Sequence, residues 1–131
     1  MCQGFQPKTG LDYGETFAPV VRYDPLRVFL AIVAAEDLEM VQFDIKTAFL
    51  YGKLDEVIYM SIPEGINLNK DGQQYVCRLN KSLYGLKQSP RCWNETFVNF
   101  LRKYNFKESQ ADKCILYIPN SSDRIVIFIC R

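Results

Sequence analysis

The stretch that decides the fold is residues 39–52, EMVQFDIKTAFLYG. From Val41 to Ile45 apolar and polar residues alternate, and this two-residue period predicts a half-buried β-strand. The core face of the strand would carry Val41, Phe43 and Ile45. Asp44 falls on the opposite face, near the end of the strand.

Two interpretations of Asp44 follow from its surroundings. A carboxylate at the end of a strand, followed by a turn with free backbone N–H groups, could hold a divalent cation and a phosphate together. Alternatively, Asp44 is a surface residue that caps the next turn or pairs with Lys46. Both interpretations remain open on this stretch alone.

The composition is that of a folded globular protein. The chain has 131 residues, of which 48% are hydrophobic and 14% aromatic, and this is enough for one domain with a core, or a piece of one. The net charge of +1 by itself indicates neither a nucleic-acid binder nor a membrane-surface protein.

Charge is nevertheless segregated along the chain. Residues 36–64 hold seven acids against Lys46 and Lys53, whereas residues 78–103 hold six basic residues against the single acid Glu95. This pattern suits a phosphate-rich ligand held near metal-binding acids, and it equally suits two solvated faces that attract one another.

The cysteines give no sign of a zinc site. There are five, widely spaced and without a CxxC pair, and the chain contains no histidine. Because the sequence shows no signal peptide, transmembrane run or lipidation motif, we expect free thiols, an intracellular location in the cytoplasm or nucleus, and no membrane partner.

Two helices are predicted. Residues 1–23 form an extended lead-in, after which Asp24 serves as N-cap and Pro25 as first helical residue of a helix that is apolar on several faces and so covered on more than one side. Ser89 and Pro90 open the second helix. Its apolar stripe, which we expect to be core, contains Trp93, Phe97, Phe100, Leu101 and Tyr104.

Two hairpins complete the predicted fold. Residues 57–62 and 75–79 form one, with a turn at Asp71–Gly72, and residues 114–118 and 125–130 form the other. The last strand, IVIFIC, is apolar on both faces, which indicates a strand buried inside a sheet. The fold class is therefore α+β, with an antiparallel sheet backed by two main helices.

Four stretches in this order resemble the reverse transcriptase domain of copia-type LTR retrotransposon Pol polyproteins. They are residues 4–34, GFQPKTGLDYGETFAPVVRYDPLRVFLAIVA; residues 39–65, EMVQFDIKTAFLYGKLDEVIYMSIPEG; residues 76–97, VCRLNKSLYGLKQSPRCWNETF; and residues 100–118, FLRKYNFKESQADKCILYI. The resemblance implies a partial right-hand polymerase of palm and fingers, truncated at both ends. Residues 1–131 would be one partial domain, with residues 24–131 as the fingers and palm fragment.

The resemblance also implies roles for the first motif. Asp44 matches the first of the family's three metal-binding aspartates, which makes it the expected catalytic residue and Mg²⁺ ligand. Lys46, Thr47 and Ala48 would run under the triphosphate of a deoxynucleotide, and Phe49 would be the aromatic gate at the sugar C2′ position. Without the family, Phe49 is equally well a core aromatic.

The second motif, by the same resemblance, lies against the templating base and the nucleotide. Gly85 allows close backbone approach, and Tyr84 could stack on a base or sugar. Lys87 and Arg91 would meet phosphates, and Gln88 between them is also expected to contact the template or nucleotide. The alternative is an ordinary loop at a helix start with solvated basic residues.

One departure from the family pattern decides the expected activity. The Tyr-x-Asp-Asp turn, which holds the second and third aspartates directly after the strand written here IVIFIC, does not occur in the 131 residues. We therefore expect a retrotransposon RNA-directed DNA polymerase fragment that is inactive alone, with an RNA or DNA template-primer, a deoxynucleotide and the rest of the polyprotein as the family's partners. The alternatives are a non-catalytic nucleic-acid-binding module and a transposon remnant without function.

Overall fold

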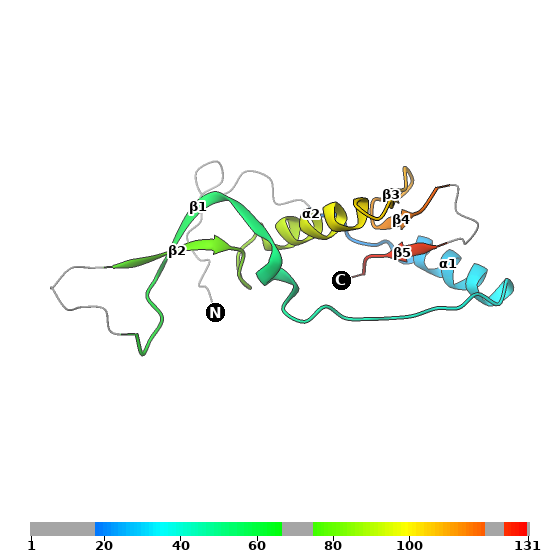
Figure 1. Cartoon of the computed structure of the whole chain (residues 1–131). Helices are drawn as coiled ribbons and strands as arrows, with labels where there is room; N and C mark the ends of the chain where they lie inside the picture. Colours follow the sequence, from blue (N-terminus) through cyan, green and yellow to red (C-terminus); the bar gives the residue numbers. More distant parts are fainter. Residues whose placement is uncertain (1–17, 67–74, 120–124, 131) are drawn as a thin grey trace. The chain divides into compact units, whose positions relative to one another are not determined.

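The computed structural model describes residues 18–66, 75–119 and 125–130 (Figure 1). The described chain divides into two compact units, which we call the hairpin unit (residues 47–96) and the sheet unit (residues 18–46 and 97–130). Helix α2 (Ser89–Arg102) begins in the first unit and ends in the second. No helix among the described residues has the length and apolar character needed to cross a bilayer.

The hairpin unit is built on strands β1 (Lys53–Ser61) and β2 (Val76–Lys81), which pair antiparallel with Ile58 opposite Leu79. This confirms the first predicted hairpin, although β1 begins four residues earlier than predicted. Exposed and half-buried side chains alternate along β1, as the two-residue period of a strand requires. The predicted Asp71–Gly72 turn lies outside the described residues.

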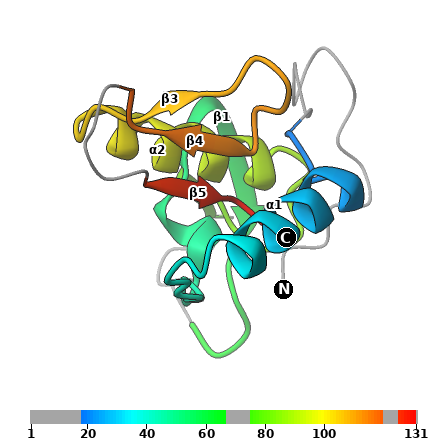
Figure 2. The same cartoon turned by 90° about the vertical axis from the view of Figure 1, so that its right-hand side faces the viewer.

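The sheet unit contains strands β3 (Lys107–Glu108), β4 (Ile115–Tyr117) and β5 (Val126–Phe128), antiparallel in that order (Figure 2). The pairing of β4 with β5 confirms the second predicted hairpin. β3 was not predicted, because two residues carry no detectable period. The core of this unit joins the end of α2 to the sheet and consists of Val98, Leu101 and Leu116, flanked by Phe97, Phe106, Ile127 and Ile129.

Helix α2 begins at Ser89, as predicted, but part of its predicted apolar stripe is exposed. Leu101 is buried, whereas Phe100 is 50% exposed and its ring lies 5.1 Å from that of the exposed Tyr104. The prediction of a core role was wrong for these two rings. Consecutive residues lie 100° apart around a helix, so the helix that buries Val98 and Leu101 turns Phe100 toward solvent.

Helix α1 (Tyr23–Ala35) is more exposed than its sequence predicts. It has no buried residue, and Val28 is 60% exposed, so cover on more than one side is not present in the described structure. Its side chain Phe29 packs on Phe128 of β5, with ring centroids 4.3 Å apart. The N-cap of α1 is Arg22, so the prediction of Asp24 as N-cap was wrong. Asp24 lies in the first turn, where its negative charge interacts favourably with the helix dipole.

Two strand predictions were also wrong. Residues 41–45 form no paired strand, and Val41 and Phe43 of the expected core face are 78% and 69% exposed. β5 lies at the edge of its described sheet, with Val126 exposed, rather than between two strands. Alternation or apolar character predicts a strand, but pairing and burial require neighbours. The described residues supply no paired neighbour for residues 41–45 and only one, β4, for β5. The α+β class is confirmed.

Candidate nucleotide site

The end of the first motif forms a short 3₁₀ helix, η1 (Ala48–Tyr51). Thr47, directly before it, has the left-handed backbone φ of 55°, and its carbonyl accepts a hydrogen bond from the Leu50 N–H at 2.9 Å. The Gly52 N–H donates to the Phe49 carbonyl at 3.1 Å and closes the turn. The chain therefore turns over residues 47–52, and the Leu50 and Gly52 N–H groups are used within this turn.

Ser82 joins this turn to the second motif. It follows β2, is fully buried, and donates its backbone N–H to the Gly52 carbonyl at 2.9 Å. Its hydroxyl donates to the Phe49 carbonyl. Ser82 thus donates hydrogen bonds to both Phe49 and Gly52, the two ends of this turn.

Gly52 leaves no space in this contact. A Cβ atom at Gly52 would lie 2.6 Å from the Ser82 Oγ and 3.0 Å from both the carbonyl carbon and the Cβ of Cys92, in the first turn of α2. Its backbone (φ −64°, ψ 129°) is open to any residue, so the reason for glycine is space and not conformation. The turn at Gly52, the residue Ser82 after β2 and the first turn of α2 are therefore in close contact.

Residues 82–89 form the loop between β2 and α2. Gly85 has φ 101°, in the left-handed region that favours glycine, and the buried Ser89 hydroxyl donates to the Leu83 carbonyl at 2.5 Å. Tyr84 is 47% exposed, and its ring lies 4.8 Å from that of Phe49 at an angle of 55°. The two motifs, 35 positions apart at these rings, therefore meet in one aromatic contact.

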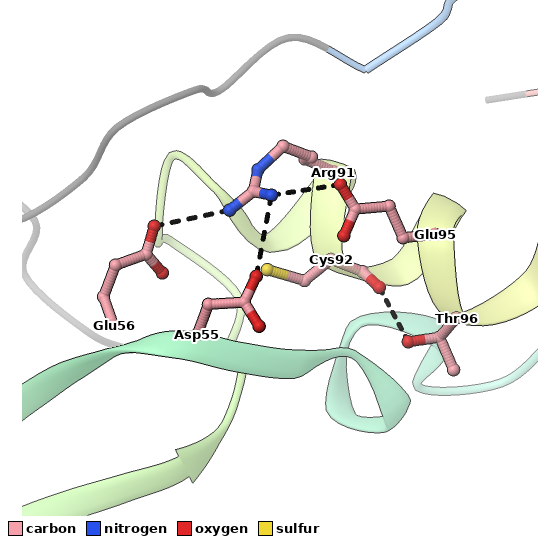
Figure 3. A network of polar contacts seen from close by, with 6 residues as sticks. All are labelled: Asp55, Glu56, Arg91, Cys92, Glu95 and Thr96. Carbon is pink, nitrogen blue, oxygen red and sulfur yellow. Dashed lines mark hydrogen bonds and ion pairs between the residues drawn. The ribbon is translucent and has the colours of Figure 1, made fainter.

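Arg91 lies within a cluster of carboxylates between α2 and β1 (Figure 3). Its guanidinium is 3.0 Å from Glu95, 3.3 Å from Glu56 and 3.8 Å from Asp55, and its side chain is 15% exposed. Burial alone would lower the pKa of Arg91, but the hydrogen bond to Glu95 and the surrounding carboxylates raise it. At this point the basic and acidic segments attract one another directly.

The other residues predicted to contact the template or nucleotide differ in access. Gln88 is buried, whereas Gly85 and Lys87 are exposed like Tyr84. The Tyr84 and Lys87 side chains are exposed, while Arg91 is paired with three protein carboxylates.

Asp44 and Lys46 belong to the sheet unit, and Thr47, Ala48 and Phe49 to the hairpin unit. Asp44 is exposed, and the described residues contain no group of three or more His, Cys, Asp or Glu side chains able to hold a metal ion. A carboxylate is the donor that Mg²⁺ prefers, but one carboxylate is not a complete donor set. The described residues therefore do not make a full Mg²⁺ site.

Sequence reasoning missed the residues that hold this site together. Ser82 and Gly52 lie inside the quoted stretches but were assigned no role in the site, since their role comes from contacts between segments 30 positions apart. The Arg91–Glu95 pair had a detectable signal, because opposite charges four residues apart on a helix face each other.

Comparison with known proteins identifies a family. A family model described as reverse transcriptase (RNA-dependent DNA polymerase) matches residues 1–130. The chain is 42% identical over 127 residues to the retrovirus-related Pol polyprotein from transposon TNT 1-94 of Nicotiana tabacum, covering 97% of this chain and 10% of the relative. It is 35% identical over 129 residues to those from transposons RE1 and RE2 of Arabidopsis thaliana, covering 98% of this chain and 9% of each relative. The chain thus spans about a tenth of the length of these relatives, and no solved structure matches.

Proposed function

This chain belongs to the reverse transcriptase (RNA-dependent DNA polymerase) family, and we propose that it is the nucleotide-binding part of a copia-type retrotransposon Pol polyprotein, in a palm and fingers arrangement. Its ligands would be a deoxynucleoside triphosphate and an RNA or DNA template-primer. The rest of the polyprotein would supply the remaining parts of the polymerase.

The observation that carries the proposal is the contact between the two motifs. Phe49 and Tyr84 lie 4.8 Å apart, and Ser82 ties the turn that bears Phe49 to the loop that bears Tyr84. A ring at the sugar position discriminates by contact, since a ribose 2′-hydroxyl needs space that the ring occupies. Exposed Lys87, three residues beyond Tyr84, adds positive charge for a phosphate.

Asp44 is proposed as one Mg²⁺ ligand. When bound, Mg²⁺ ions neutralise charge on the triphosphate and on the oxygens that exchange at phosphorus. The contribution of this chain would be a hard carboxylate oxygen at Asp44, followed directly by the Lys46–Thr47 turn. The family's other two aspartates do not occur in these 131 residues.

We infer that the 131 residues alone do not polymerise DNA. Loss of metal ligands removes several kcal/mol of transition-state stabilisation, and about 1.4 kcal/mol is tenfold in rate. Primer extension on an RNA template with Mg²⁺ or Mn²⁺ tests this, with Asp44→Ala as the control. Template-dependent incorporation above that of Asp44→Ala would contradict the inference.

Nucleotide binding tests the proposal itself. We expect a deoxynucleoside triphosphate to bind the chain more tightly with Mg²⁺ than without, and Asp44→Asn to remove this difference in a calorimetric titration. Glu39→Gln, an exposed acid on the same segment, is the matched control and should keep it. Equal metal dependence in both variants would overturn the role of Asp44, and no binding to the unmodified chain would overturn the proposal.

A non-catalytic nucleic-acid-binding module is the competing function. It would use Lys87 and Arg91, but Arg91 is already paired with three carboxylates. Binding to single-stranded RNA that falls steeply with salt and is lost in Lys87→Ala with Arg91→Ala, without any nucleotide binding, would favour this alternative.

A further inference from the structure

We propose that Tyr84 and Ser82 are positioning residues that set the orientation of the Phe49 ring, so that the Phe49–Tyr84 pair, and not Phe49 alone, selects a deoxynucleoside triphosphate over a ribonucleoside triphosphate. This inference rests on the proposed nucleotide site. It assigns to Tyr84 a task that does not require direct contact with the nucleotide.

The first step is that Phe49 cannot position its own ring. It lies on a 3₁₀ helix of four residues, and its side chain is only half-buried. A phenylalanine has three staggered χ1 wells, and a ring with solvent on one side can exchange between them. A steric gate that rotates away no longer excludes a 2′-hydroxyl.

The second step is that the backbone below the ring is fixed. The Phe49 carbonyl accepts hydrogen bonds from both the Gly52 N–H and the Ser82 hydroxyl, and Ser82 is fully buried. Gly52 packs against Ser82 and Cys92 with no space for a Cβ atom. The backbone of Phe49 is therefore fixed by a residue of the second motif, Ser82.

The third step is that Tyr84 occupies one side of the Phe49 ring. The centroid distance of 4.8 Å and the angle of 55° are those of a favourable tilted aromatic pair. Such a pair shifts a conformational equilibrium by about two- to tenfold. Tyr84 itself lies in a loop where Gly85 has a left-handed φ and the Ser89 hydroxyl donates to the Leu83 carbonyl.

The consequence for specificity is a defined fold-change. Removing the Tyr84 ring frees Phe49 to turn away, so affinity for the ribonucleotide rises while that for the deoxynucleotide changes little. We expect Tyr84→Ala to reduce the deoxy-to-ribo affinity ratio by about two- to tenfold. Tyr84→Phe keeps the ring and should keep the ratio.

The test is a titration of the chain with dGTP and with GTP in the presence of Mg²⁺. Four proteins are compared with the unmodified chain: Tyr84→Ala, Tyr84→Phe, Phe49→Ala, and the double variant of Tyr84→Ala with Phe49→Ala. The proposal requires that Tyr84→Ala has no further effect on the ratio once Phe49 is alanine, since it acts through that ring. Tyr59→Ala, an exposed tyrosine on β1, is the matched control and should leave the ratio unchanged.

Other results would overturn the proposal. An equal loss of affinity for both nucleotides in Tyr84→Ala would make Tyr84 a plain ligand contact. Additive effects of Tyr84→Ala and Phe49→Ala would make the two rings independent. If the unmodified chain bound neither nucleotide, the proposed function would fail, whereas binding with an unchanged ratio in Tyr84→Ala would defeat only the positioning role.

A nucleotide-free measurement keeps the inference testable by itself. Three-bond coupling constants of Phe49 report its χ1 populations by NMR. We expect one dominant rotamer in the unmodified chain and in Tyr84→Phe, and averaged values in Tyr84→Ala and in Ser82→Ala. Unchanged couplings in a folded Tyr84→Ala protein would refute the positioning role.

Discussion

Residues 82–89 of the second motif and residues 39–45 of the first motif are held in opposite ways. The loop of residues 82–89 contains two fully buried serines whose hydroxyls close hydrogen bonds to Phe49 and Leu83. The segment of residues 39–45 makes no strand pairing and exposes Val41, Phe43 and Asp44. Motifs of equal strength in the sequence thus give a defined geometry only where other described segments pack on them.

This contrast separates two parts of the proposed chemistry. Phe49 and Tyr84, the rings proposed to face the nucleotide, contact each other inside the hairpin unit. Asp44, the proposed Mg²⁺ ligand, is exposed and belongs to no group of three or more possible metal ligands within the described residues. We therefore expect substitutions in the first region to change stability strongly and substitutions in the second to change it little.

The largest effect is expected at Gly52. Gly52→Ala places a Cβ atom 2.6 Å from the Ser82 Oγ and 3.0 Å from Cys92, so the contact must open. Overpacking of this kind costs about 1–3 kcal/mol of unfolding free energy. Urea unfolding followed by circular dichroism measures it, with the exposed Ser61→Ala as control. A cost for Gly52→Ala equal to that of the control would show that the contact is loose.

Arg91 comes next. Arg91→Ala leaves Glu56 half-buried without its cation, with one Glu56 oxygen already lacking a partner. Because Asp55 and Glu95 remain largely exposed, we expect a loss of about 1–2 kcal/mol, below the cost of a fully buried pair. The same unfolding assay compares it with Arg102→Ala, whose ion pair with Glu108 is more exposed and should matter less. Equal losses of unfolding free energy in the two variants would show that the Arg91 cluster stabilises the fold no more than the exposed Arg102–Glu108 pair.

A smaller effect is expected from pH, through Cys92. Burial raises the pKa of the Cys92 thiol, with Glu56, Glu95 and Asp55 adding to the shift and Arg91 opposing it. Above a pH of about 8.5 the unfolded thiol loses its proton while the folded one keeps it, so the folded state binds more protons and stability falls as pH rises. The slope from this one group stays below about 1.4 kcal/mol per pH unit. Cys92→Ala should flatten the decline between pH 8 and 10, and an unchanged slope would contradict the assignment.

The sequence was most informative where the pattern is local. The start of α2 at Ser89–Pro90 and both hairpins follow from helix-start residues and two-residue alternation, and the structure confirms them. Arg91–Glu95 is also local, at helical spacing. Such features depend on neighbours within a few positions, which the sequence displays directly.

The rest depended on contacts that the sequence does not display. No sequence pattern around Ser82 predicts that its hydroxyl donates a hydrogen bond to the Phe49 carbonyl, 33 positions earlier. Phe100 carries the same apolar signal as Leu101, yet only the helix rotation decides which of them is buried. Alternation from Val41 to Ile45 predicted a strand with one core face, but residues 41–45 pair with no described strand.

The smallest effect is expected at this exposed segment. Val41→Ser with Phe43→Ser replaces side chains that are 78% and 69% exposed, so unfolding free energy should change by less than about 0.5 kcal/mol. The buried Leu116→Ala gives the scale, at about 2–5 kcal/mol. Measuring the unfolding free energy at two protein concentrations distinguishes two results that would contradict this prediction. A large cost at both would mean that the segment packs within the chain, and a cost only at the higher concentration would mean that it is covered by a second copy; in either case the contrast between the two motif stretches would no longer hold.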